Sequence, residues 1–214
     1  MKARDYTIGM YTDSQPAPPF AEASERNKAP ILESLRTVLP ERGRVLEIGS
    51  GTGQHVVHFA PAHPGLVWQP TERKEHLEGL NARIRQEGSP NILPAIELDV
   101  AGAWPDHRCV AAYSSNTAHI MSWSAVGAMF NGVAGRLLAG GAFCLYGPFN
   151  VAGSYTSASN AEFDQQLRQR DPEMGLRDVG ALEALAAACQ MQLEQRMQLP
   201  ANNQLLVFRA DGGE

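Results

Sequence analysis

The sequence is poor in the features that mark secreted, membrane-spanning and disulfide-bonded proteins. Its three cysteines, Cys109, Cys144 and Cys189, lie far apart in apolar surroundings. This pattern predicts reduced core thiols of an intracellular protein rather than a disulfide framework or a zinc site. No apolar run reaches membrane-spanning length, and no apolar signal region begins the chain. We therefore expect a cytoplasmic protein with no membrane partner.

The sequence also lacks any block of lysine or arginine, and its formal net charge is −5. Because nucleic-acid binding needs a basic face, we expect no nucleic-acid partner. His55 and His58 have a spacing that suits a metal on one helix face, but no third ligand is evident. We therefore expect both at the helix surface and no metal site. The 214 residues suit one α/β domain over 1–214, and the oligomeric state stays open.

One stretch in the first quarter of the chain predicts a binding loop. Val45 to Ile48 form a short buried strand, Gly49, Gly51 and Gly53 follow at every second position, and 54–60 form a helix that Pro61 ends. Missing side chains let a ligand approach the backbone, and the helix N-terminus offers free N–H groups and a partial positive charge. The alternative is a glycine-rich turn that binds nothing.

The order of the glycines indicates which ligand this loop suits. A dinucleotide loop has the pattern G-x-G-x-x-G, but here the third glycine comes one position early and Gln54 replaces it. The pattern E-x-G-x-G-x-G, with Glu47 inside the strand end, resembles motif I of class I S-adenosylmethionine-dependent methyltransferases. An acid suits a cofactor that carries an ammonium and a sulfonium group. Gln54 disfavours the alternative of an NAD-binding reductase.

The chain before this loop predicts an arm and a covering helix, together residues 1–40. Residues 1–23 are irregular and contain three aromatic side chains, so they form either a loose tail or an arm that folds over the site. Asn27 is predicted to cap a helix over 28–39 whose apolar positions share one face. We expect Arg26 and Asn27 to close over the cofactor, with Arg26 at its carboxylate.

Two acids follow the next predicted strands. Glu72 comes after the strand 66–70, at the distance past the glycine loop where an acid binds ribose hydroxyls. Its alternative role is a favourable acid at the start of the helix 74–87. Asp99 and Val100 come after the strand 91–98, and the methyltransferase resemblance implies a contact between Asp99 and the adenine amino group. The alternative is an aspartate that caps a turn.

The fourth predicted strand, 109–115, leads to a candidate catalytic residue. His119 lies just past the strand end, and an imidazole with a pKa near neutrality can take a proton from an oxygen, nitrogen or thiol nucleophile. Its alternative state is a histidine bonded to a backbone carbonyl group. Asn116 is predicted as an uncharged orienting group that also contacts the cofactor. The D/N-P-P-Y signature of many amino-methylating enzymes is absent.

The remaining sequence predicts a helix over 123–138 that Gly140-Gly141 closes, a strand 142–147, a helix 178–189, and an antiparallel hairpin of 191–199 with 204–209. A polar insert, 150–177, interrupts this order and contains a short helix over 161–169. Loops above strand ends select substrates in such folds, so we expect the insert to be a substrate lid; the alternative is a solvated connection. The predicted substrate contacts are Tyr146, Asn160, Asp164, Arg170, Asn202 and Asn203.

Ten short motifs spread over the chain resemble the DUF938 (UPF0585) family, of the methyltransferase-like protein 26 type. They include N-K-x-P-I-L-E at 27–33, L-E-I-x-S-G-T-G-Q-H at 46–55, N-x-x-H-I at 116–120, T-S-x-S-N-x-x-F-D at 156–164 and P-A-N-N at 200–203. The resemblance implies a Rossmann-like class I methyltransferase fold: a seven-stranded, mostly parallel sheet with a C-terminal antiparallel hairpin and helices on both faces. It carries over no substrate.

The combined prediction is an S-adenosylmethionine-dependent methyltransferase that acts on a small molecule. The predicted cofactor contacts are Arg26, Asn27, Glu47, Gly49, Ser50, Gly51, Gly53, Glu72, Asp99, Val100 and Asn116. The alternative without chemistry is a protein that binds S-adenosylmethionine or S-adenosylhomocysteine and does not turn it over.

Overall fold

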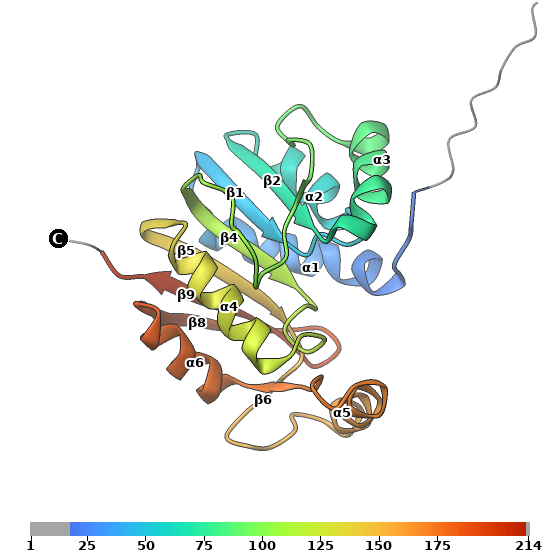
Figure 1. The fold of residues 1–214 in the computed structure, drawn as a ribbon, viewed down its shortest axis with the longest axis vertical. Helices are drawn as coiled ribbons and strands as arrows, with labels where there is room; N and C mark the ends of the chain where they lie inside the picture. The colour runs from blue at the N-terminus through green and yellow to red at the C-terminus, as the bar shows by residue number, and fades with distance from the viewer. Residues whose placement is uncertain (1–17, 213–214) are drawn as a thin grey trace, which may run out of the picture.

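The computed structural model describes residues 18–212, and its centre is a seven-stranded sheet with the order β3-β2-β1-β4-β5-β9-β8 (Figure 1). The strands are β1 (Gly43–Ile48), β2 (Leu66–Glu72), β3 (Ile96–Glu97), β4 (Cys109–Ser115), β5 (Leu137–Gly147), β8 (Met191–Leu199) and β9 (Asn203–Ala210). The first five pair in parallel, whereas β9 pairs antiparallel with both β5 and β8. This confirms the predicted fold. Most of the predicted N-terminal arm falls on 1–17, outside the described residues.

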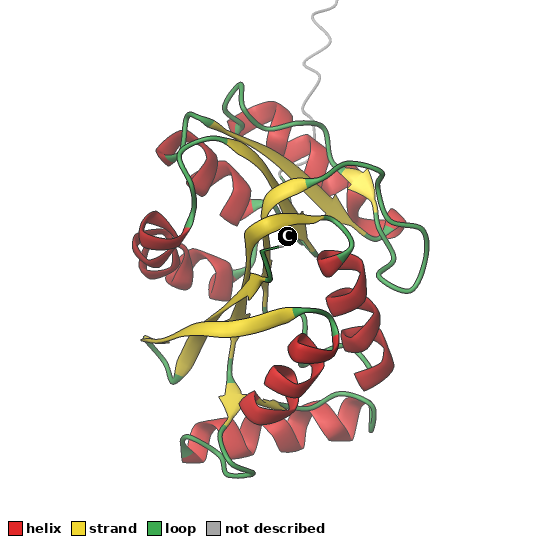
Figure 2. Cartoon of the chain, turned by 90° about the vertical axis from the view of Figure 1, so that its left-hand side faces the viewer, coloured by secondary structure: helices red, strands yellow, loops and turns green. Residues whose placement is uncertain are grey.

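Helices cover both faces of the sheet, as Figure 2 shows from the side. The helices are α1 (Glu22–Val38), α2 (Gln54–Phe59), α3 (Leu77–Glu87), α4 (Trp123–Ala134), α5 (Ala158–Arg170) and α6 (Val179–Ala188). Side chains of α1 and α2 share one apolar core, and side chains of α4 and α6 share the other. Short 3-10 turns, Ala60–Ala62 and Lys74–His76, follow α2 and precede α3. No helix within 18–212 is long and apolar enough to cross a membrane.

The strand β1 lies inside the sheet, between β2 and β4, and its last four residues are buried, as expected for a strand covered by helices on both faces. Val45 packs in the core below α1 and α2, while Leu46 and Ile48 pack in the core below α4 and α6. The chain places β2 and β3 on one side of β1 and then crosses to place β4 and β5 on the other. The strand order therefore reverses between β1 and β4, and open α/β sheets bind ligands in the crevice at such a point.

The first helix begins earlier than predicted, which makes the capping role of Asn27 wrong. α1 starts at Glu22, with Ala21 as its cap, so that Asn27 lies inside the helix. The Ala21 N–H donates to the Gln54 side-chain oxygen at 2.7 Å, and Gln54 Nε2 donates to a Glu25 carboxylate oxygen at 2.9 Å. These bonds fix the start of α1 beside the glycine loop. Because Gln54 is distant in the sequence, the residue pattern of α1 alone does not predict this start.

Two further boundaries differ from the prediction. The helix α4 ends at Ala134, and Gly140-Gly141 lie within β5, where a Cβ atom on Gly141 would come within 2.8 Å of the Leu138 carbonyl oxygen. These glycines therefore allow an irregular strand pairing instead of closing a helix. The third strand shrinks to Ile96–Glu97, since residues before it pair with β2 only through an isolated bridge at Ile92.

A small parallel pair, β6 (Phe149–Asn150) with β7 (Arg177–Asp178), holds both ends of the segment that carries α5. The helix α5 starts at Ala158, three residues before its predicted start, because Ser157 caps it by accepting from the Asn160 N–H at 3.1 Å. In Figure 1 this helix lies past the carboxyl end of the sheet, next to the turn between β8 and β9. The segment therefore reaches the crevice at the strand ends.

The buried guanidinium group of Arg83 joins α3 to the glycine loop and to the chain before α1. Its Nε atom donates to the Thr52 carbonyl oxygen at 2.7 Å, and Nη2 donates to the Pro19 carbonyl oxygen at 2.8 Å. Nη1 donates to both carboxylate oxygens of Glu87, at 2.7 and 2.8 Å. One side chain thus fixes three segments that are distant in the sequence.

We expect Arg83→Met to lower the free energy of unfolding by about 2 kcal/mol, because a hydrogen bond to a charged group contributes about 1.5–3 kcal/mol. The substitution keeps the apolar stem and removes the donors to Thr52 and Pro19. Denaturant unfolding measures the change. Arg85→Met, at an exposed position of the same helix, is the control and should stay within about 0.5 kcal/mol of the parent protein. Equal losses in the two variants would contradict the linking role of Arg83.

Candidate active site

Two cavities lie at the carboxyl ends of the parallel strands. The first, the glycine-loop cavity, has a volume of about 710 Å³ and is lined by the loop after β1, by the ends of β2 and β4 and by the loop after β3. The second, the α5 cavity, also has a volume of about 710 Å³ and lies between α1, α5, the end of β5 and the β8–β9 turn. Asn116 lines both cavities.

The three glycines of the loop have different roles. All have positive φ angles, +67° at Gly49, +55° at Gly51 and +79° at Gly53. A Cβ atom on Gly49 would come within 2.7 Å of the Thr117 side chain, and one on Gly53 within 2.8 Å of Leu80. A Cβ atom on Gly51 would meet nothing within 4 Å. Gly51 therefore leaves open space at the wall of the glycine-loop cavity, whereas Gly53 allows α2 and α3 to pack and does not line the cavity.

The carboxylate of Glu72 lies at the end of β2 in the wall of the glycine-loop cavity. Its Oε2 atom accepts from the Gly51 N–H at 2.6 Å, and Oε1 accepts from the Arg73 N–H at 2.8 Å. Each carboxylate oxygen keeps a further lone pair for a ligand hydroxyl group. The bond to Gly51 also ties the loop to the neighbouring strand.

Asp99 and Val100 line the same cavity past the end of β3. The Asp99 carboxylate accepts from the Ala101 N–H at 3.0 Å, and its carbonyl oxygen accepts from the Gly102 N–H at 2.9 Å. Asp99 thus closes a turn, as the alternative interpretation expected. The exposed side chain still faces the cavity, so the turn and a ligand contact are compatible.

Glu47 is buried behind the glycine loop and does not line the cavity. The residue is 2% exposed, and its Oε2 atom has no hydrogen-bond partner in the described part of the chain. Burial, reinforced by the nearby Glu72 carboxylate, raises the pKa of Glu47 from 4.5 to about 7. Glu47 is therefore a group that is partly protonated near neutrality, next to the loop rather than in direct contact with the open space.

His119 is buried in the wall of the α5 cavity and is neutral. Burial lowers its pKa from 6.5 to about 4, and the nearby Arg177 guanidinium acts in the same direction. The Phe163 ring meets the imidazole edge-on, with centroids 5.2 Å apart. Within residues 18–212 the imidazole nitrogens make no hydrogen bond, and the contact with a backbone carbonyl that the alternative interpretation required is absent. The ring can therefore accept a hydrogen bond from a ligand.

His55 is a site residue that the sequence analysis missed. It was expected at the helix surface, but it is 6% exposed, lines the glycine-loop cavity and stacks on Phe59. Its Nε2 atom lies 2.7 Å from Asn27 Oδ1, and its Nδ1 atom lies 3.3 Å from the Tyr113 hydroxyl. The signal was the position of His55 four residues before Phe59, on the buried face of a short helix.

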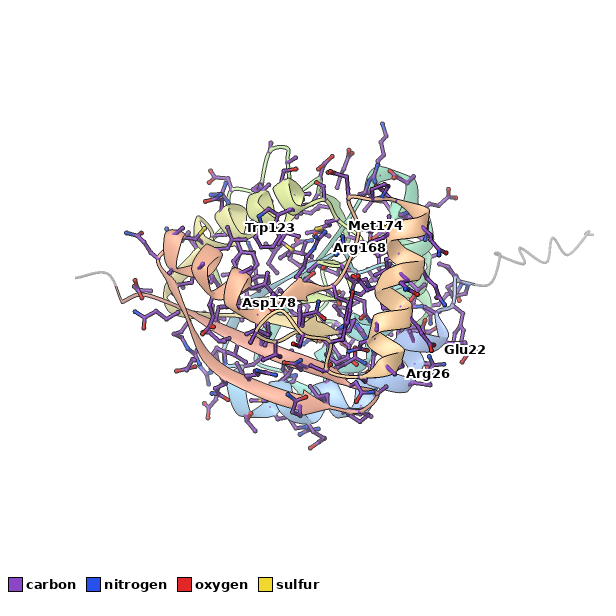
Figure 3. The ribbon with its side chains drawn as sticks, turned by 90° about the horizontal axis from the view of Figure 1, so that it is seen from below. Glu22, Arg26, Trp123, Arg168, Met174 and Asp178 are labelled. Atoms are coloured by element: carbon purple, nitrogen blue, oxygen red, sulfur yellow. The ribbon has the colours of Figure 1, made fainter. Side chains whose placement is uncertain are left out.

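The structure places Arg26, Asn27 and Arg170 in cavities other than the expected ones. Arg26 and Asn27 were expected at the cofactor, but they line the α5 cavity, because α1 starts early and presents this face to α5. Arg170 was expected at the substrate, but it lies at the end of α5 and lines the glycine-loop cavity. In Figure 3, Arg26 lies beside one end of α5 and Met174 lies near the other end.

The predicted substrate residues divide into two groups. Tyr146, Asn160 and Asn203 line the α5 cavity together with His119, as expected from their strand and loop positions. Asp164 does not: it is 1% exposed, and its carboxylate is occupied by Arg168, the Tyr155 hydroxyl and the Leu176 N–H. Its role is to hold the insert together. Asn202 does not line the cavity, and its carbonyl oxygen accepts from Asn160 Nδ2 at 3.2 Å.

The insert 150–177 contributes walls to both cavities and is bonded to the loop that carries His119. The Gly175 N–H donates to the His119 carbonyl oxygen at 2.9 Å, and Arg177 Nε donates to the Ala118 carbonyl oxygen at 3.0 Å. The Arg177 guanidinium also lies 5.8 Å from the centroid of the Trp123 ring. The insert therefore contacts the site, and its role as a substrate lid stays a prediction.

No cluster of three or more histidine, cysteine or acidic side chains within 18–212 has the arrangement of a metal site. The glycine loop, its open position at Gly51 and the acid at the end of β2 lie together at the carboxyl ends of the strands, where open α/β sheets bind ligands. The model of the DUF938 family, described as a protein of unknown function, matches residues 18–210. The chain belongs to the DUF938 family.

Solved methyltransferase structures share the fold. An O-methyltransferase family protein from Burkholderia thailandensis is 14% identical with a TM-score of 0.76, over 90% of this chain and 59% of that chain. Human N-acetylserotonin methyltransferase, solved with S-adenosylmethionine, is 12% identical with a TM-score of 0.76, over 89% and 53%. CalO1, a methyltransferase of calicheamicin biosynthesis solved with S-adenosylhomocysteine, is 17% identical with a TM-score of 0.71, over 88% and 55%. The DUF938 chain thus spans just over half the length of these proteins.

Glu47→Gln tests the buried acid behind the loop. Between pH 4.5 and about 7 the folded protein holds a proton that the unfolded chain has released, so the free energy of unfolding falls as the pH rises through this window. Glutamine has no proton to lose. Relative to the parent protein, the variant should gain up to about 3 kcal/mol of stability between pH 4.5 and pH 8. Urea unfolding at a series of pH values measures this, and a difference that does not change with pH would contradict it.

Proposed function

We propose that this DUF938 protein is an S-adenosylmethionine-dependent methyltransferase that acts on a small molecule. The observation that carries the proposal is the glycine loop at the point where the strand order reverses: Gly51 leaves its backbone open to a cavity whose wall also holds Glu72. Asn116 joins this cavity to a second one. A cofactor and an acceptor can thus meet at one shared residue.

The residues of the glycine-loop cavity fit S-adenosylmethionine. The Glu72 carboxylate suits the ribose hydroxyl groups, and the segment Leu98–Val100 suits the adenine ring. Arg170 lines this cavity, so it suits the carboxylate of the cofactor better than Arg26 does. Glu47 lies close enough to the loop to favour a positively charged ligand, because a nearby cation stabilises the ionised form of its carboxyl group.

S-adenosylmethionine supplies an electrophilic methyl group, and attack by an acceptor forms a carbon–heteroatom bond, breaks the carbon–sulfur bond and leaves S-adenosylhomocysteine and one proton. The chain's part is to position the acceptor and to receive this proton. Neutral His119 accepts the hydrogen bond of the acceptor's O–H, N–H or S–H group, which points a lone pair toward Asn116 and the first cavity. The neighbour from Burkholderia thailandensis is described as an O-methyltransferase family protein, so a hydroxyl group is the first acceptor to test.

The size and lining of the α5 cavity favour a small acceptor. Its volume of about 710 Å³ lies in the range of small-molecule sites. Most side chains of its wall are neutral, and three separate parts of the chain contribute to the wall: α1, α5 and the β8–β9 turn. A methyltransferase for a nucleic acid would need a basic surface instead.

Cofactor binding is tested first with Gly51→Val. We expect the parent protein to bind S-adenosylhomocysteine with a micromolar Kd, about −8 kcal/mol, in calorimetry. Valine at 51 would fill the open space in the cavity wall and remove this binding. The control is Gly140→Val. Gly140 also has a positive φ, +71°, and open space beside it, but it lies near the start of β5, away from the carboxyl ends of the strands that line the cavity. Unchanged binding in the first variant would contradict the cofactor site, and a similar loss in both would indicate backbone strain.

His119→Ala is expected to lower methyl transfer by roughly 10²–10⁴-fold while the affinity for S-adenosylhomocysteine stays nearly unchanged. Transfer of labelled methyl groups to a panel of phenols, thiols and amines measures the rate. Because His119 has a pKa of about 4, the rate of the parent protein should show no inflection near pH 6.5 from this group. The control is His107→Ala, because His107 lies just before the start of β4, away from the carboxyl ends of the strands. A parental rate in His119→Ala would refute the catalytic role alone, and labelling only of RNA or intact protein would refute the small-molecule acceptor.

A further inference from the structure

One wall of the α5 cavity carries the charge that selects its ligand. Ala23, Arg26, Asn27 and Pro30 have the spacing of one helix face, and all four line the cavity. Among the described lining residues, Arg26 is the one with a charged side chain, and His119 is neutral. No aspartate or glutamate is among the described residues that line this cavity; Glu22 lies one turn before Arg26 on α1, and both are exposed. The lining of the cavity therefore carries one positive charge.

The neighbouring Asn27 is oriented by a buried hydrogen-bond chain. Its Oδ1 atom lies 2.7 Å from His55 Nε2, and His55 Nδ1 lies 3.3 Å from the Tyr113 hydroxyl. Tyr113 is fully buried and His55 is 6% exposed, so no solvent competes with these contacts. The chain connects a residue of the glycine-loop cavity, His55, with a residue of the α5 cavity, Asn27.

The protonation states of this chain fix the direction of its hydrogen bonds. Burial lowers the pKa of His55 to about 4 and raises the pKa of Tyr113 far above its usual value, so the ring is neutral and the phenol keeps its proton. The Tyr113 O–H then donates to Nδ1, and the remaining ring proton, on Nε2, donates to Asn27 Oδ1. The amide oxygen of Asn27 is thereby used. Its NH₂ group has two hydrogens: one donates to the Tyr146 hydroxyl, and the second can donate to a ligand in the α5 cavity.

The other parts of the wall suit a flat ligand with a group that reacts at the far end. Phe163 and Tyr146 supply aromatic surface, and His119 with Asn116 supplies neutral hydrogen-bonding groups where the two cavities meet. The positively charged donor of Arg26 and the neutral acceptor of His119 give the cavity two chemically different kinds of partner for a ligand. A ligand that matches both has an anionic end and a hydroxyl end.

We propose that the acceptor is a small aromatic hydroxy acid, whose carboxylate binds Arg26 and the Asn27 amide while its hydroxyl group faces His119 and Asn116. The inference deepens the proposed function and rests on it for the fate of the hydroxyl group. Tyr113 and His55 are positioning residues, since they act on the ligand through Asn27. Recognition of the carboxylate depends on the α5 cavity alone.

The test is calorimetry of the protein saturated with S-adenosylhomocysteine, with the three hydroxybenzoate isomers as probes. Each acid is paired with its neutral carboxamide, which has nearly the same shape. We expect at least one acid to bind about tenfold or more tightly than its amide, about 1.4 kcal/mol. The proposal would be overturned if acids and amides bind equally, or if no acid binds with a Kd below about 10 mM, which corresponds to about −3 kcal/mol.

Variants then identify the groups that recognise the carboxylate. Arg26→Gln should abolish the preference for acids, and Tyr113→Phe should reduce it severalfold while amide binding stays unchanged. The change in preference distinguishes positioning from a general loss of structure, which would weaken both ligands. Arg36→Gln, at an exposed position of the same helix, is the matched control and should keep the preference. A full preference in Arg26→Gln would overturn the proposal.

The same titration separates this inference from the proposed function. The acids are also titrated into the protein without S-adenosylhomocysteine. If the protein then binds the acids but does not bind S-adenosylhomocysteine, the methyltransferase proposal fails and the carboxylate site stands. If it binds S-adenosylhomocysteine and methylates neutral phenols or amines as well as the acids, the methyltransferase proposal stands and the carboxylate site fails.

Discussion

The pairing of β1 with β2 on one side and β4 on the other is the constraint on which the rest of the structure depends. It forces the chain to cross the sheet between β3 and β4, so that the loops after β1 and β4 diverge and leave a crevice between them. The glycine loop can line that crevice because its positive φ angles turn the chain sharply away from β1. Arg83 and Gln54 then hold the loop against α3 and α1.

Much of this fold could be predicted from the sequence, because local patterns encode it. The strand before the glycines, the strand Cys109–Ser115 and the C-terminal hairpin all have apolar runs and turn residues that leave few alternatives. The boundaries that differ depend on distant partners. The start of α1 is set by Gln54 across 33 residues of sequence, and Gly141 belongs to a strand because of its contact with β4.

The sequence could predict which residues lie near the site, but it could not predict which cavity each side chain lines. Glu72 and His119 follow strand ends, and the carboxyl ends of parallel strands share one edge of the sheet. The cavity that Arg26 or Arg170 lines depends instead on how α1 and α5 lie across that edge. The periodicity of apolar residues in a helix does not predict this arrangement. Asp164 had the composition of a ligand-binding acid, but the Leu176 N–H and the Tyr155 hydroxyl occupy it. His55 was missed because six residues of helix give too little pattern to define a buried face.

Asn116 belongs to the walls of both cavities, and its backbone is held by a bond from its N–H to the Tyr146 carbonyl oxygen at 2.9 Å, with φ at +57°. A ligand in one cavity that shifts Asn116 therefore changes the wall that the other ligand meets. Any such coupling is reciprocal: the factor by which the first ligand alters the affinity for the second equals the factor by which the second alters the affinity for the first. One asparagine thereby gives the two cavities a common residue through which their affinities can be coupled, whichever ligand binds first.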